Sequence, residues 1–348
     1  MALTPPPMQR GDRAPNFVLP GPDGSRRILY ELVTGRPAVV ALVDAESVTA
    51  FLDRAGDIDD AGADLFLLAA AAPGDLPTDG DSTAKVLADG DGKVSRQLAA
   101  AVGGTPSALV LDGNQRVLET VEAPGGVADV VAAALEILED LRSEAPPPRI
   151  TGVAPVLIVP NVLDRAVCRR LINVWETEGN KEGTVAPIDK DGPDNVVDPA
   201  VKKRRDHVVE NVELGRYLAH VLGRRLAPEI LKAHHFDIKQ FDRFIIACYD
   251  AARGDHFAAH RDNLGADTAH RDFAVSLNLN AEDHEGGELR FPEYGPHLYA
   301  PPTGAAVVFS CTMLHQALPV AAGRRFVLLT FANGEKTDEQ QTRFRQLG

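Results

Sequence analysis

Apolar and polar positions follow two different rhythms in the two halves of the chain. Before residue 150, short apolar runs that suit buried strands alternate with segments of helical spacing. Alternating strands and helices predict a small α/β domain. The strand-like runs are 38–43, 65–70, 107–112 and 116–121, and the closing helix is 127–141.

The second half is dominated by strands. After a helix at about 165–176 and another at about 214–231, apolar residues alternate with small or polar ones in Phe273–Asn280, so that one face packs and the other faces a wet or reactive space. Short strands separated by Gly and Pro turns predict a barrel or double-sheet jelly roll. The strand runs are 244–249, 273–280, 287–291, 305–311 and 325–331.

A proline-rich segment separates the halves. Glu144–Arg149 contains three consecutive prolines, which cannot continue a helix and favour extended backbone. We therefore expect two domains, residues 1–145 and 153–348, joined by a linker at 146–152.

Composition and charge narrow the classes of function. The 348 residues carry a net charge of −14, so a nucleic-acid partner would require a local basic groove. The run Lys202–Arg205 is the one candidate, and we expect it to be solvated in a loop. The longest apolar run, 65–72, is too short to span a bilayer, and no apolar signal segment opens the chain. Three cysteines without zinc spacing suit a reducing compartment, so we expect a cytoplasmic protein with no membrane contact.

Two segments of the first half carry a family signature. Gly11–Leu19 and Gly104–Ser107 resemble the N-terminal signature and the cis-proline segment of the thioredoxin-fold redoxins, peroxiredoxins in particular. That family places its reactive cysteine just after the strand that is here 38–43, but all cysteines of this chain follow residue 150. Ser47 and Thr49 cannot replace it, because the attacking nucleophile is a thiolate. We expect a redox-inactive module that is structural or binds a partner, which argues against a thiol peroxidase.

A candidate metal site lies in the strand-rich half. Residues two apart on an extended segment project to the same side, so His260 and Asp262 can chelate one ion while Arg261 points away. His315 follows much later in the chain. Two imidazoles and one carboxylate are the facial triad of non-haem Fe(II) sites, which leaves positions open for a co-substrate and oxygen.

The tripeptide His-Arg-Asp occurs again at 270–272. We favour the first copy because it follows the segment Gly254–Phe257 and leaves a loop before the strand at Phe273. The tripeptide also matches the catalytic loop of protein kinases, but the residues that should accompany it are absent. His256 lies near the site, where a pocket-lining and a structural role are both open. The remaining histidines are expected to be solvated or packed: His207, His220, His234, His235, His284 and His297.

An arginine is expected on an apolar strand face in the last strand run. Alternation places Arg325 on the same side as Val327 and Leu329. A guanidinium buried there needs an anion, and a bidentate carboxylate would satisfy it.

Together these motifs follow one another in a specific order: His-x-Asp, Glu285–Leu289, Pro302–Gly304, His315–Val320 and Arg325. This order resembles the prolyl 4-hydroxylase-like family of Fe(II)/2-oxoglutarate dioxygenases over nearly all of residues 153–333. The resemblance implies a double-stranded β-helix, or jelly roll, with flanking helices. It also implies iron at His260, Asp262 and His315, the distal carboxylate of 2-oxoglutarate on Arg325, and help to the co-substrate from Tyr249.

The same resemblance implies a dioxygenase that hydroxylates a prolyl-type peptidyl residue or a small amino-acid-like substrate and releases succinate and CO₂. The implied cofactors are Fe(II), 2-oxoglutarate and O₂, with ascorbate as a candidate addition. The loop 179–206 is a candidate substrate lid because it is long and polar. The alternative is a non-catalytic metal-binding adaptor whose redox-inactive N-terminal domain binds a protein partner.

Overall fold

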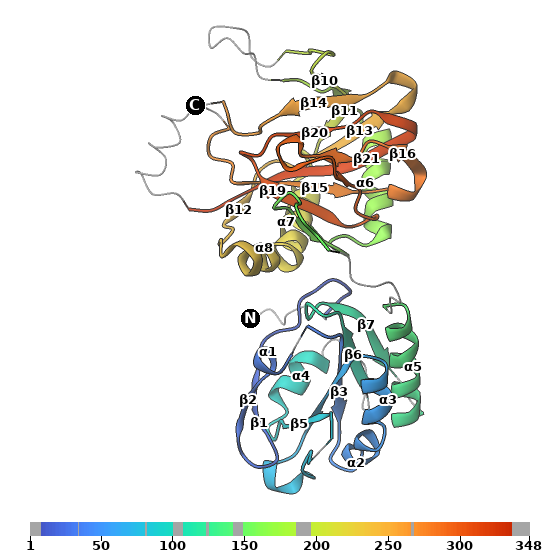
Figure 1. Cartoon of the computed structure of the whole chain (residues 1–348), viewed down its shortest axis with the longest axis vertical. Coiled ribbons are helices and arrows are strands. Elements are labelled where there is room, and N and C mark those ends of the chain that lie inside the picture. Colours follow the sequence, from blue (N-terminus) through green and yellow to red (C-terminus); the bar gives the residue numbers. More distant parts are fainter. Residues whose placement is uncertain are drawn as a thin grey trace. The chain divides into compact units, whose positions relative to one another are not determined.

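The chain divides into two compact units, residues 1–147 and 148–348, each taken here by itself (Figure 1). The expected cis-proline segment 104–107 lies outside the described residues except for Ser107, as does the first part of the expected linker, 146–148. The computed structural model describes residues 8–33, 35–80, 82–99, 107–122, 125–141, 149–185, 196–265 and 268–335.

A five-stranded sheet forms the centre of the first unit, in the order β5-β4-β3-β6-β7. β3, β4 and β5 are parallel, whereas β6 and β7 form an antiparallel hairpin beside β3. All six residues of β3 are buried, as expected for a strand covered on both faces. The strands are β3 (Ala38–Val43), β4 (Asp64–Ala69), β5 (Lys85–Ala88), β6 (Ser107–Leu111) and β7 (Val117–Glu122), with a separate ribbon of β1 (Val18–Pro20) and β2 (Arg26–Ile28).

Helices cover both faces of this sheet (Figure 1). Three of them share one apolar core with the sheet, and two share the core on the opposite face. Parallel β3 and β4, the antiparallel hairpin and the closing helix form a thioredoxin-like fold, which confirms the expectation for this half. The first group is α2 (Val48–Leu52), α3 (Ala55–Asp60) and α5 (Val127–Glu139), and the second is α1 (Leu29–Leu32) and α4 (Lys93–Ala99).

Two antiparallel sheets form the second unit. The larger has the order β8-β19-β15-β21-β13-β11-β9, and the smaller has the order β10-β14-β20-β17-β18. An apolar core between them draws residues from both sheets, which is the double-stranded β-helix expected from the sequence.

The strands of the larger sheet are β8 (Leu157–Val159), β9 (Lys181–Glu182), β11 (Arg205–Val208), β13 (Ile245–Asp250), β15 (Phe273–Asn278), β19 (Ala306–Ser310) and β21 (Val320–Asn333), with β12 (Gln240–Phe241) and β16 (His284–Gly286) paired to β21. Those of the smaller sheet are β10 (Lys202–Lys203), β14 (His256–His260), β17 (Leu289–Arg290), β18 (Leu298–Tyr299) and β20 (His315–Ala317).

Three helices pack on the outer face of the larger sheet: α6 (Arg165–Thr177), α7 (Val212–Arg225) and α8 (Ala227–His234). The prediction of a single helix at 214–231 is wrong, because two helices, α7 and α8, meet at Leu226. Pro228 lies in the first turn of α8. Backbone N–H groups of the first turn have no acceptor within the helix, so a proline there costs no hydrogen bond. Among the described residues, no helix has the length and apolar character needed to cross a membrane.

The segment expected to be an irregular loop, 179–206, contains short strands. β9 pairs with β11, a bridge joins Val185 to Val196, and β10 pairs with β14. Residues 186–195 lie outside the described part of the chain. The described parts of the segment 179–206 therefore pair with strands of both sheets, and β10 lies beside the strand that carries His260.

Candidate metal centre

The three expected metal ligands come together where two strands of the smaller sheet pair. β14 ends at His260 and β20 begins at His315, and these residues lie opposite each other in the antiparallel register. The backbone N–H of Asp262 donates to the carbonyl of Cys311 at 3.0 Å, which holds Asp262 close by. One ligand atom of each of the three side chains lies within 4.8 Å of the others.

Backbone carbonyls orient both imidazoles. Nδ1 of His260 lies 2.8 Å from the carbonyl of Ala258, and Nδ1 of His315 lies 3.1 Å from that of Met313, so each Nδ1 donates. This leaves both Nε2 lone pairs available, at 3.5 and 3.4 Å from the two carboxylate oxygens of Asp262. An imidazole held in this way through one nitrogen is the usual form of a metal-binding histidine.

The protonation states suit a divalent cation. Burial lowers the pKa of His315 to about 4, so its imidazole is neutral at neutral pH. Burial by itself raises the pKa of Asp262, but the neighbouring imidazoles and the guanidinium of Arg271 outweigh it, so the pKa lies below its ordinary value. A neutral imidazole and an ionised carboxylate are the forms that bind metal.

Aromatic rings pack against the two imidazoles. The rings of Phe257 and His260 are stacked, with centroids 3.5 Å apart and planes at 16°. Phe309 lies 4.5 Å from the ring of His315. These contacts restrict the imidazole orientations and exclude water from one side of the site.

The second His-Arg-Asp copy does not form a comparable group. His270 is exposed, and its Nε2 lies 3.9 Å from a carboxylate oxygen of Asp242. In the described part of the chain, the only group of three or more candidate ligands is His260, Asp262 and His315. His256 approaches two backbone carbonyls, those of Gly254 and Ala200, which supports its structural role.

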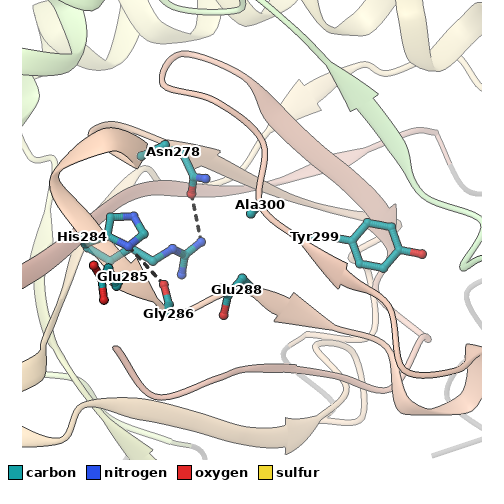
Figure 2. A pocket seen from close by; sticks show the side chains of 10 residues that line it. Asn278, His284, Glu285, Gly286, Glu288, Tyr299 and Ala300 are labelled. Carbon is teal, nitrogen blue, oxygen red and sulfur yellow. Dashed lines mark hydrogen bonds between the residues drawn. The ribbon is translucent and has the colours of Figure 1, made fainter. Parts of the chain in front are cut away.

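Arg325 borders a cavity of about 280 Å³ that is also lined by Asn278, His284, Glu288 and Tyr299 (Figure 2). Its guanidinium donates to Oδ1 of Asn278 at 3.0 Å. Arg325 is 3% exposed, and burial lowers its pKa to about 10. No carboxylate of the described residues forms an ion pair with it. The three metal-ligand candidates do not line this cavity. Two carboxylates, those of Glu285 and Glu288, do line it, but neither forms an ion pair with Arg325.

Tyr249 lies directly opposite Arg325 in the register of β13 and β21. The guanidinium carbon of Arg325 is 5.5 Å from the ring centroid. The Tyr249 hydroxyl accepts a hydrogen bond from Nη1 of Arg204 at 2.7 Å. The structure thus brings Tyr249 and Arg325 together, as the sequence led us to expect, and adds a second buried arginine.

The expectation that the basic run 202–205 is solvated is wrong for two of its members. Lys202 and Arg204 are 7% and 5% exposed. Nζ of Lys202 donates to the carbonyl of Thr184 at 3.0 Å and to Asp206 at 3.1 Å, while Arg204 donates to Asp206 at 2.8 Å. Both cations also lie 5.4 Å from the ring centroid of Phe257. Alternation along the chain turns these two side chains inward, and Asp206 compensates their charge.

Arg271, the arginine of the second His-Arg-Asp copy, is a further candidate functional residue, and it lies where the resembled dioxygenase family tends to carry an arginine. It is 9% exposed, and its guanidinium lies over the ring of Phe331 at 3.7 Å. One nitrogen donates to Asp242 at 3.3 Å, whereas the buried Nε has no hydrogen-bond partner. Its charge contributes to the lowered pKa of Asp262. The sequence feature that points to Arg271 is the second His-Arg-Asp tripeptide, in which the arginine, and not the histidine, is buried.

Thiol chemistry has no support in the structure. Cys168, Cys248 and Cys311 are all buried. Burial raises the pKa of Cys168 and of Cys248 to about 12, so both stay protonated at neutral pH. In the first unit, Ser47 precedes α2, where the redoxin family places its cysteine, and its N–H donates to Asp44.

Comparison with known proteins identifies the family. Residues 244–333 match the 2OG-Fe(II) oxygenase superfamily. A PKHD-type hydroxylase of Paracoccus denitrificans (strain Pd 1222) is 32% identical over 164 residues, which cover 43% of this chain and 69% of that protein. The chain belongs to the 2OG-Fe(II) oxygenase superfamily, whose members are oxidoreductases that use Fe(II) and 2-oxoglutarate.

More distant relatives and solved structures extend the comparison. Procollagen-lysine,2-oxoglutarate 5-dioxygenase 1 of Mus musculus is 25% identical over 182 residues, 49% of this chain but only 23% of that enzyme. A Trichoplax adhaerens prolyl hydroxylase, solved with a hypoxia inducible factor peptide, is 18% identical and covers 56% of this chain and 88% of its own, with a TM-score of 0.43. Peroxidoxin BcpB of Mycobacterium tuberculosis is 20% identical and covers 39% of this chain and 99% of its own, with a TM-score of 0.34.

Proposed function

We propose that this protein is an Fe(II)- and 2-oxoglutarate-dependent hydroxylase of a prolyl-type peptidyl residue or of a small amino-acid-like substrate. The observation that carries the proposal is the triad of His260, Asp262 and His315, with both Nε2 atoms facing one carboxylate. In this assignment residues 153–348 form the oxygenase domain, residues 1–145 the redoxin-like domain, and 146–152 the linker.

The triad fits a divalent iron ion by its chemistry. Two neutral imidazoles and one carboxylate are the donor set of non-haem Fe(II) oxygenases. When bound, iron would supply the site at which 2-oxoglutarate and O₂ react to give succinate, CO₂ and a hydroxylated product. The protein's own part is to hold Nε2 of His260 and His315 in position through Nδ1 and to keep Asp262 ionised.

Arg325 is the proposed anchor for the distal carboxylate of 2-oxoglutarate. A buried guanidinium that has only an amide oxygen as its hydrogen-bond acceptor retains donors for an anion. A carboxylate can accept two parallel hydrogen bonds from it, and such charge-assisted pairs are about twice as strong as neutral ones. Tyr249 lies beside it and is the second residue proposed to assist the co-substrate.

The substrate class is proposed from the relatives. One relative is named for procollagen lysine, and one solved neighbour holds a peptide, so peptidyl substrates come first. The segment 179–206, in which Lys202 donates to the carbonyl of Thr184 and β10 pairs with β14, is the proposed substrate lid.

The first experiment measures succinate from 2-oxoglutarate by the full chain, with Fe(II) and air and with a panel of proline- and lysine-containing peptides and free amino acids. We expect Fe(II)-dependent succinate, accelerated by the true substrate, and no succinate from His260→Ala. Parallel reactions with and without ascorbate test that cofactor. Metal binding without any succinate would refute the proposal and favour the non-catalytic adaptor, in which the redox-inactive first unit binds a protein partner.

A further inference from the structure

An ion pair lies directly behind the metal ligands. Arg261 stands between His260 and Asp262 in the sequence, and its side chain reaches Glu293. Nη2 donates to Oε1 of Glu293 at 2.7 Å, and Nη1 donates to Oε2 at 3.2 Å, so the pair is bidentate. Because this geometry fixes both groups in one plane, it defines where residue 261 lies.

The same carboxylate also holds the segment that carries the third ligand. Oε2 of Glu293 accepts the backbone N–H of Leu314 at 3.2 Å, and Leu314 directly precedes His315. Nη1 of Arg261 also donates to the carbonyl of Thr312. Each of the three metal ligands is therefore the immediate neighbour in sequence of a residue that is hydrogen-bonded to Glu293.

Regular strand pairing leaves this region in need of such support. The register of β14 and β20 is irregular between Phe257 and His260, and β14 ends at His260. Beyond that point, the hydrogen bond from Asp262 to Cys311 is a backbone link between the two ligand-bearing segments. Glu293, from the short helical turn Pro292–Tyr294, adds a side-chain link between the same segments.

We infer that Arg261 and Glu293 are positioning residues that hold the three metal ligands at their mutual distances. The inference rests on the proposed function, since it assigns the triad to a metal. The side chains of Arg261 and Glu293 are 31% and 42% exposed, and ion pairs at such positions contribute little to global stability. Loss of the pair should therefore appear in metal affinity and leave the unfolding temperature nearly unchanged.

The test titrates the full chain with Co(II), and anaerobically with Fe(II), in the absence of 2-oxoglutarate. We expect Glu293→Ala to weaken metal binding about tenfold, in the range found for residues that orient metal ligands. Glu293→Gln keeps an acceptor for Leu314 but loses the ion pair, so its effect should be smaller. The double variant Arg261→Ala/Glu293→Ala should bind little more weakly than Glu293→Ala, because the ion pair is already lost in the single variant and only the hydrogen bond from Arg261 to the carbonyl of Thr312 is removed in addition.

Glu282→Ala is the matched control. Arg165 and Glu282 form a second bidentate pair, at 2.8 and 3.3 Å, with exposed side chains. Among the described residues, this pair has no hydrogen bond or ion pair to either ligand-bearing segment. Metal affinity of this control should equal that of the wild type. If Glu293→Ala does not fold, Glu293→Gln and Arg261→Lys provide the comparison.

The outcomes separate the two claims. Wild-type affinity in both Glu293→Ala and Glu293→Gln, within about twofold, would overturn the positioning role and leave the proposed function intact. An equal loss in Glu282→Ala would overturn it as well, because the effect would then be general. A wild type that binds Co(II) and Fe(II) no better than His260→Ala would refute the metal site itself, and the positioning role with it.

Discussion

Replacing Arg325 by methionine should change stability and co-substrate binding in opposite directions. Burial shifts the pKa of Arg325 from 12.5 to about 10, which corresponds to about 3 kcal/mol of cost for the charged form. Methionine removes that cost and retains most of the apolar stem, but it leaves Oδ1 of Asn278 without its donor, at about 1–2 kcal/mol. The ligand-free variant should be more stable than the wild type by about 1–2 kcal/mol, a rise of roughly 4 °C in Tm.

Binding of 2-oxoglutarate should fall sharply in the same variant. Loss of one partner of a buried charge pair costs about 2–5 kcal/mol, so the affinity should drop by about 30-fold or more. In the wild type, a concentration of about 100 Kd stabilises the protein by about 2.7 kcal/mol. Thermal unfolding of the metal-loaded chain, with and without 2-oxoglutarate, should therefore show a ligand-dependent rise in Tm that Arg325→Met lacks.

Arg324→Met is the control for this prediction. The side chain of Arg324 is 46% exposed and pairs with Glu176 at 2.8 Å. Arg324 is thus a positive charge next to Arg325 in sequence that does not line the cavity. This variant should keep the full rise in Tm with 2-oxoglutarate. The reasoning would be refuted if Arg325→Met kept that rise, or if its ligand-free form were less stable than the wild type by several kcal/mol.

Three further predictions concern the same unit. His260→Ala should abolish Fe(II)-dependent succinate formation and His270→Ala should retain it, and the reverse result would assign the metal to the second tripeptide. Burial lowers the pKa of Lys202 from 10.5 to about 8. Between pH 8 and pH 10.5 the unfolded chain therefore binds more protons than the folded chain, and the free energy of unfolding rises with pH by up to about 3 kcal/mol. Urea unfolding at pH about 8 and about 10 should show that rise in the wild type and not in Lys202→Met. The same change of unfolding free energy with pH in both proteins would contradict the prediction. Gly304→Ala should lower the unfolding free energy by more than about 2 kcal/mol, because φ is +82° and a Cβ would lie 2.1 Å from the carbonyl of Leu163; unchanged urea unfolding would refute this.

Local pattern explains why much of the fold was predictable. The run Ala38–Val43 has the bounds of β3, since six consecutive apolar residues suit a strand buried on both faces. In β21, alternation correctly placed Arg325 and Val327 on the side away from Phe326, which packs against the helices. The prediction of one helix at 214–231 was wrong because the apolar periodicity continues through Leu226, whereas the helical backbone is interrupted there.

The metal site was predictable to the extent that its residues are distinctive. His260 and Asp262 are two apart on an extended segment, which is a local property, and His315 stood out through the motifs around it. The partners that complete the site could not be read in this way. Glu293 reaches Arg261 across 32 positions, and Arg204 reaches Tyr249 across 45.

The sequence alone determined the two fold classes, the absence of a redox cysteine in the first half and the identity of the three metal-ligand candidates, because each depends on residue type or on spacing along one element. Tertiary structure decided which charges are buried: it turned Lys202 and Arg204 inward, left the Nε of Arg271 without a partner and set Arg325 beside a cavity without an ion-paired carboxylate. Burial and pairing depend on every segment that packs around a group, and that information is spread over the whole chain.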